Sequence, residues 1–105
     1  MEEKLTAIRK AVSRYGFVMT AHADEEAREE EISLKDIREA IRNGEIIEDY
    51  PYHRRGPCCL IHAILSSSKS IHLVITTEKI PPRVITVYEP RKPRWVTPRR
   101  RRRER

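Results

Sequence analysis

The sequence has no long apolar run, and this absence excludes a membrane-spanning helix. A helix that crosses a bilayer needs about 18 apolar residues in succession, and the 105-residue chain contains no such stretch. The first residues, MEEKLTAIRKAV, are acidic and amphipathic, and they lack the basic start and the apolar segment of a signal peptide. We therefore expect a cytoplasmic protein that has no membrane partner.

Cysteine is also scarce, and the two cysteines, Cys58 and Cys59, are adjacent. Neighbouring side chains of an extended strand point to opposite faces, so a disulfide between them is sterically poor and reduced thiols are expected. A zinc knuckle has two residues between its cysteines, whereas these two cysteines have none between them. His53 and His62 lie close by, and a metal-binding regulator is the alternative interpretation, but we expect no metal site.

Other chemical signatures are absent too. The chain shows no phosphate-binding loop, no glycine-rich turn and no serine-nucleophile motif. The acids of residues 24–31 crowd one expected helix that has a thin apolar stripe, so they indicate a solvated face rather than paired catalytic carboxylates. We expect no cofactor.

Positive charge is concentrated at the C-terminus. Residues 91–105 carry nine basic residues and one acid, whereas residues 1–90 carry 13 basic and 15 acidic residues. Residues 50–90 alone carry five basic and two acidic residues. An anionic partner is therefore expected at the second half of the domain and at the tail. The arginines of the tail would attract any polyanion without reading its sequence.

Apolar spacing predicts helices in the first half of the chain. Leu5, Ile8 and Val12 recur at helical spacing within residues 2–16. Residues 21–31 are rich in charge and alanine and predict a surface helix. Ser33 and Asp36 form a capping-box pattern, and the helix that they start should end at Asn43 and Gly44.

After Gly44 the pattern alternates and predicts strands at residues 45–51, 58–66, 70–77 and 83–90. Helices followed by a run of strands are typical of an α+β protein. We expect one domain over residues 1–90, in which two or three N-terminal helices pack on one face of a three- or four-stranded antiparallel sheet. Residues 91–105 contain prolines and no apolar period, which predicts a disordered tail.

Alternation along the strands places polar side chains on a common face. The more uniformly apolar side should meet the helices, and the mixed side should be open. The mixed side carries His62, His72, Thr76, Thr86 and Tyr88. Arginine favours phosphate, and histidine and tyrosine offer a flat ring for a base and a proton donor or acceptor, so this face could hold a polar ligand. Its phosphate-binding residues would be Arg54, Arg55 and Arg83. The alternative is that these are ordinary residues of half-exposed strands.

His22 stands at the start of the acidic helix, where an imidazole could act in catalysis. The alternative is that His22 packs on the edge of the sheet or helps to cap the helix.

An ordered set of motifs resembles a known family. HADEEAREEEISLKDIREAIRNGEIIEDYP, a cysteine-containing strand and IHLVITTEKIPPRVITVYEP together span residues 22–90. They are similar to small bacterial and archaeal domains of unknown function. That family is grouped with RelE-like toxin folds, and some members are similar to the MqsR class of mRNA-cleaving toxins, often encoded beside a zinc-finger antitoxin.

The resemblance implies helices packed on a curved antiparallel sheet, a metal-independent ribonuclease that acts on mRNA, and a small antitoxin protein as partner. The polar residues that match the family pattern are implied to be catalytic: His22, His72, Thr86 and Tyr88. Many relatives place arginines in the helix after the histidine, where this chain has Glu26 and Glu30. Because that difference would remove two phosphate contacts, the alternative function is a non-catalytic module that binds RNA or a protein.

Overall fold

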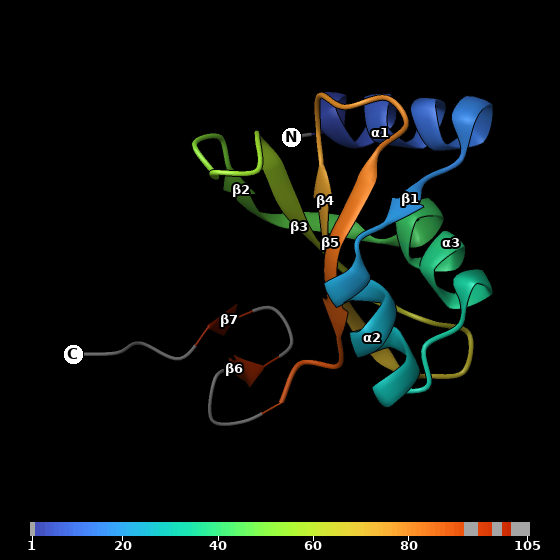
Figure 1. Cartoon of the computed structure of the whole chain (residues 1–105). Helices are drawn as coiled ribbons and strands as arrows, with labels where there is room; N and C mark the ends of the chain where they lie inside the picture. The colour runs from blue at the N-terminus through green and yellow to red at the C-terminus, as the bar shows by residue number, and fades with distance from the viewer. Residues whose placement is uncertain (1, 92–94, 98–99, 102–105) are drawn as a thin grey trace.

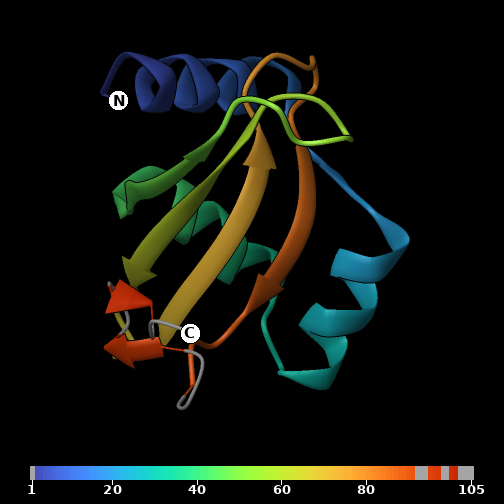
Figure 2. The ribbon, with the colours of Figure 1, turned by 90° about the vertical axis from the view of Figure 1, so that its left-hand side faces the viewer.

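The computed structural model describes residues 2–91, 95–97 and 100–101. Three helices pack against a five-stranded sheet (Figure 1), as expected for an α+β fold. The helices come first along the chain: α1 (Glu2–Tyr15), α2 (Ala21–Glu29) and α3 (Leu34–Asn43). The strands of the sheet are β1 (Val18–Met19), β2 (Glu45–Tyr50), β3 (Cys58–Ile64), β4 (Ser70–Thr76) and β5 (Arg83–Tyr88). α1 and α3 lie on one face of the sheet, and α2 packs along the edge at β5 (Figures 1 and 2).

The order of strands across the sheet is β1-β5-β4-β3-β2. The four long strands are antiparallel neighbours, as predicted. The prediction of three or four strands was wrong by one, because β1 adds a parallel edge strand beside β5. The Val18 N–H donates to the Pro82 carbonyl at 2.9 Å, and the Thr20 N–H donates to the Val84 carbonyl at 3.0 Å. These bonds join segments that are far apart in sequence, which local periodicity does not reveal.

The helix ends follow the local signals. Ser33 and Asp36 form a complete capping box at the start of α3. Gly44 ends α3 where the backbone passes so close to its surroundings that an added Cβ would lie 2.6 Å from the Ala40 carbonyl and 2.6 Å from Ile61. The Arg9 side chain donates to the Ile41 and Gly44 carbonyls, which ties α1 to the end of α3. The helices and the sheet are thereby fixed together at this junction.

Both faces of the sheet carry apolar side chains. The main core lies between the helices and the sheet and includes Ile8, Ile37, Ile61 and Leu73, all nearly or fully buried. A second, smaller cluster on the opposite face contains Cys58, Leu60, Val74 and Ile85. Alternation therefore identified the two faces of β3 and β4, but the face away from the helices is not open: His62, His72 and Thr76 are all buried.

A β-bulge corrects the predicted faces of β5. Val74 pairs with Thr86, but the next residue of β4, Ile75, pairs with Val84, so Ile85 is an extra residue. Val84 therefore joins the helix-side core and Ile85 joins the opposite cluster, whereas unbroken alternation would put Val84 on the same side as Thr86 and Tyr88 and Ile85 on the helix side. Tyr88 remains on the face away from the helices, paired with His72.

Two short strands follow the domain. β6 (Trp95–Thr97) and β7 (Arg100–Arg101) form a separate two-stranded sheet. Figures 1 and 2 both place it on the side of the main sheet away from the helices, and Figure 2 shows it next to the end of β3. The rest of the predicted tail, residues 92–94, 98–99 and 102–105, lies outside the described residues. No helix in the described part of the chain is long and apolar enough to cross a membrane.

Candidate functional site

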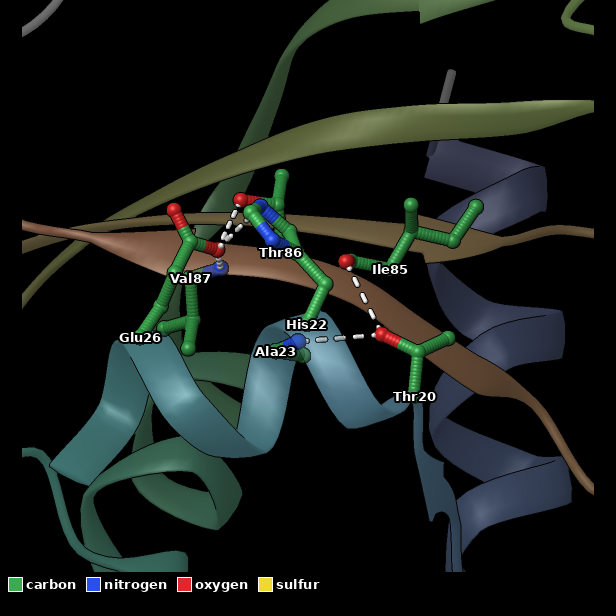
Figure 3. A network of polar contacts seen from close by, with 7 residues as sticks. All are labelled: Thr20, His22, Ala23, Glu26, Ile85, Thr86 and Val87. Atoms are coloured by element: carbon green, nitrogen blue, oxygen red, sulfur yellow. Dashed lines mark hydrogen bonds and ion pairs between the residues drawn. The ribbon is translucent and has the colours of Figure 1, made fainter.

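A polar network joins α2 to the edge of β5 (Figure 3). It begins at Thr20, the N-cap of α2, whose hydroxyl accepts a 3.0 Å hydrogen bond from the Ala23 N–H. The same hydroxyl donates to the Ile85 carbonyl at 3.1 Å. Thr20 therefore starts the helix and also fixes its first turn against β5, which sets the position of the side chains that follow.

Glu26 is the centre of this network. Its Oε1 atom accepts hydrogen bonds from the Thr86 hydroxyl and, at 3.1 Å, from the Val87 N–H. The Nε2 atom of His22, one turn earlier on α2, lies 3.3 Å from the same oxygen. The His22 side chain is 64% exposed, whereas that of Glu26 is 23% exposed. The result is an imidazole at the surface, paired with a carboxylate that the strand holds in place.

A second polar pair lies on the face away from the helices. Nδ1 of His72 is 3.3 Å from the Tyr88 hydroxyl, and their ring centroids are 5.4 Å apart. His72 is fully buried and Tyr88 is half-buried. On the other side of His72, the ring of His62 makes an edge contact at 5.5 Å. Three neighbouring strands thus contribute one row of rings, which the register His62↔His72↔Tyr88 aligns.

His62 has an unusual environment within this row. Its Nε2 atom is buried and has no hydrogen-bond partner among the described residues. Burial lowers the pKa of the His62 imidazole below its usual value, because the charged form would lose its hydration. His62 is therefore a neutral packing residue near pH 7, which agrees with the structural interpretation of this position.

The four predicted catalytic residues come together around the end of β5, but in two pairs. His22 and Thr86 share Glu26 at the strand edge, and His72 and Tyr88 touch on the face of the sheet. Thr86 and Tyr88 are two residues apart on one strand, a separation of roughly 7 Å. His72 is fully buried, whereas His22 is open to solvent.

The predicted phosphate-binding arginines lie at the other end of the sheet. Arg54 and Arg55 are exposed in the loop before β3, and Arg83 begins β5. The Thr77 N–H donates to the Pro57 carbonyl at 3.0 Å, and the Arg83 N–H donates to the Thr76 hydroxyl at 2.9 Å, which joins the two loops that carry these arginines. Thr76 stands four residues from His72 along β4, or roughly 13 Å. The arginines therefore form a separate basic end and do not surround the His72–Tyr88 pair.

Two residues near the site were not predicted to act there. Glu26 was interpreted as part of a solvated acidic face and as a lost arginine, but it bonds to β5, and its spacing of four from His22 places both on one helix face. Arg91 lies next to the site, because its guanidinium is 3.3 Å from Glu30 and 3.7 Å from Glu89. No local signal separates Arg91 from the other arginines of the tail, since its position depends on the docking of α2 against β5.

The histidine and cysteine cluster in residues 53–62 does not converge. Nδ1 of His53 accepts a 3.1 Å hydrogen bond from the Arg55 N–H within the loop. Cys58 and Cys59 are free thiols buried on opposite faces of the sheet, and burial raises the pKa of both. In the part of the chain that the structure describes, no three His, Cys, Asp or Glu side chains are grouped as metal ligands.

Comparison with known proteins identifies the family. A search of curated proteins and a search of solved structures each gave no match. A family model described as a domain of unknown function, DUF4258, matches residues 19–89. The matched segment runs from the short strand β1 to the residue after β5, and it contains both polar pairs described above. The chain therefore belongs to the DUF4258 family of domains of unknown function.

Proposed function

We propose that the protein is a metal-independent endoribonuclease of the toxin type, active in the cytoplasm on mRNA and controlled by a small antitoxin protein. One observation carries this proposal: an exposed imidazole, His22, is paired with a carboxylate that is itself fixed by the neighbouring strand. A histidine that is oriented by a carboxylate and open to solvent is suited to act as a general base.

The proposed reaction is an internal transfer within the RNA. His22 removes the proton from a 2′-hydroxyl, and the 2′-oxygen attacks the adjacent phosphorus. The bond from phosphorus to the 5′-oxygen breaks, and that oxygen receives a proton from the Tyr88 hydroxyl. The products are a 2′,3′-cyclic phosphate and a 5′-hydroxyl. This step consumes no water and requires no metal ion.

The remaining residues receive supporting roles. Thr86 is bound to Glu26 and stands two residues before Tyr88 on β5, and it would orient the ribose. Arg91 contacts Glu30, one turn beyond Glu26, and it would stabilise the negative charge that develops on phosphate oxygens. Arg54, Arg55 and Arg83 would hold phosphates further along the strand. His72 would act as a positioning residue, because it is buried against the Tyr88 ring.

A cleavage assay in EDTA tests this proposal. The full-length protein is incubated with a 5′-labelled single-stranded RNA, and the products are analysed for a cyclic phosphate end. We expect cleavage by the wild type and a loss of about 100-fold or more in the His22→Gln variant, since general acid–base catalysis contributes at least that much. The Thr86→Val variant should also be slow.

The matched control is His53→Gln, which removes an imidazole from the loop before β3 and should leave cleavage unchanged. Circular dichroism of every variant confirms that it is folded. Cleavage that is lost in EDTA and restored by a divalent metal, or that is unaffected by His22→Gln, would overturn the proposal.

A second candidate function is RNA binding without cleavage, and a specific observation favours it. Glu26 and Glu30, which stand where many relatives carry arginine, accept hydrogen bonds from the N–H groups of Val87 in β5 and of Glu89, the residue that follows it. Their carboxylates add negative charge beside His22, where a phosphate would have to approach. In this case the basic end, not the His22 edge, would make the main contact with RNA.

Affinity measurements separate the two functions. An Arg54→Gln/Arg55→Gln variant should bind single-stranded RNA more weakly and should show a smaller dependence of affinity on salt, because fewer counterions are released. Under the binding function, His22→Gln should retain full affinity and the wild type should leave the RNA intact. If the arginine variant kept both the affinity and the salt dependence of the wild type, the binding function would fail.

A further inference from the structure

A groove between α1 and α3 lies outside the proposed ribonuclease site. It encloses about 670 Å³, a volume typical of sites for small molecules. α1 and α3 contribute most of its walls, and the segment that links α1 to β1 closes one end. Neither His22 nor Thr86 lines it.

The floor of the groove is apolar and partly accessible. Val12, Phe17 and Met19 line it and are only partly buried, although they pack against the main core. Leu34 stands at the rim and is 50% exposed. A concave surface of this kind gains free energy when an apolar ligand covers it, because apolar area is removed from water.

The rim of the groove is positive. Arg9, Arg38 and Arg42 line it, and none of the described residues that line it is acidic. Arg38 and Arg42 are four residues apart on α3, so their side chains lie on one face of the helix. Both are exposed, and neither forms an ion pair within the described part of the chain.

The arginines differ in how much binding capacity they retain. Arg9 already donates to the Ile41 and Gly44 carbonyls, so it adds positive potential but is held in place. The Arg38 guanidinium lies 5.9 Å from the centre of the Phe17 ring, at the boundary between the rim and the apolar floor. An anionic group that contacts Arg38 and Arg42 would therefore have its apolar body directed onto Phe17.

We propose that this groove binds a small amphipathic organic anion, in which a carboxylate or phosphate group joins an apolar chain or ring system. The head group would contact Arg38 and Arg42, since guanidinium groups form charge-assisted hydrogen bonds with such oxygens. The apolar body would cover Val12, Phe17 and Met19. This site is independent of RNA cleavage, because it shares no residue with the His22 network.

Dodecanoate is the probe for this site. The full-length protein, labelled with ¹⁵N, is titrated with dodecanoate, and the amide chemical shifts are followed by NMR. We expect saturable shifts that centre on residues 12, 17, 19 and 41. Dodecyltrimethylammonium has the same chain and a positive head group, and it should cause no saturable shift at these amides.

Charge variants on the same two helices provide the comparison. Arg38→Gln/Arg42→Gln removes two exposed charges from the rim and should weaken dodecanoate binding about tenfold. Lys10→Gln/Lys35→Gln removes two exposed charges from α1 and α3 outside the groove and should change the affinity less than about twofold. Ser13→Trp, at an exposed lining position, should block the groove without disturbing the core.

The proposal fails if the shifts centre on the loop before β3 or on the C-terminal tail instead of the groove. It also fails if the two double variants weaken binding equally, or if Ser13→Trp binds as well as the wild type. Loss of RNA cleavage in any of these variants is not expected, so failure here and failure of the ribonuclease proposal can be told apart.

Discussion

The backbone N–H of Val87 donates a 3.1 Å hydrogen bond to Oε1 of Glu26, a residue 61 positions earlier in the chain. Glu30 accepts from the Glu89 N–H in the same way, at 2.9 Å. β1 pairs only with the first part of β5, so the carboxylates of Glu26 in α2 and of Glu30, the residue that caps it, occupy the remaining edge. An edge that is covered in this way cannot pair with a strand of another chain.

Replacing Glu26 should therefore destabilise the fold. In Glu26→Ala, the Val87 N–H and the Thr86 hydroxyl lose their shared acceptor, and we expect the free energy of unfolding to fall by about 1–2 kcal/mol. Urea denaturation followed by circular dichroism measures this change. The control is Glu29→Ala, an exposed position on the same helix, which should change stability by less than about 0.5 kcal/mol. Similar losses in both variants would contradict the role of Glu26.

Gly44 should not tolerate a side chain. A Cβ at this position would meet the Ala40 carbonyl, the Ile61 side chain and, at 2.8 Å, the His62 carbonyl. We expect Gly44→Ala to lower the free energy of unfolding by about 3 kcal/mol, because two of these contacts are with backbone atoms that cannot move independently. Gly16→Ala is the comparison: φ at Gly16 is +74°, but no atom lies within 4 Å of the added Cβ, so a cost of only about 1 kcal/mol is expected. Thermal unfolding measures the stability of both variants. A larger loss in Gly16→Ala than in Gly44→Ala would contradict the prediction.

His62 should make stability depend on pH. Burial lowers its pKa in the folded protein, so below about pH 6.5 the unfolded chain binds a proton that the folded chain does not. Stability should consequently fall as the pH decreases from 6.5 towards the folded pKa, with a slope of up to about 1.4 kcal/mol per pH unit. Urea denaturation at pH 7.5 and at pH 5.5 tests this in the wild type and in His62→Leu. The variant should lose less stability on acidification, and an identical loss would exclude His62 as the source.

The two cysteines should be unreactive in the folded protein. Both thiols are fully buried, and burial raises the pKa of Cys59 to about 12, so little reactive thiolate is present at pH 8. We expect Ellman's reagent to label neither thiol at pH 8 on the time scale of minutes, and both after unfolding in urea. A Ser67→Cys variant, changed in the exposed turn between β3 and β4, should react at once. Rapid labelling of the wild type would contradict this prediction, because it would show that the core around the cysteines opens readily.

The helices were predictable because their signals are local. The capping pair Ser33 and Asp36 and the end at Gly44 lie within one stretch of chain, and the observed bounds of α3 agree with that prediction. The four long strands were also found within one or two residues of their ends, since alternation is visible in each strand by itself. The candidate site was only partly predictable. His72 and Tyr88 share a face by alternation, but their burial depends on what packs over that face.

The amino-acid sequence by itself determined the order of helices and strands, the capping of α3 and the two faces of β3 and β4, because each depends on residues that are neighbours along the chain. The tertiary structure decided the rest. It added β1 as a fifth strand, and it placed Ile85 in a bulge that reverses part of β5. It brought His22 and Thr86 together at the carboxylate of Glu26. It placed Arg54, Arg55 and Arg83 at the opposite end of the sheet. These features depend on register and on the docking of α2, which are set by contacts between residues distant in sequence.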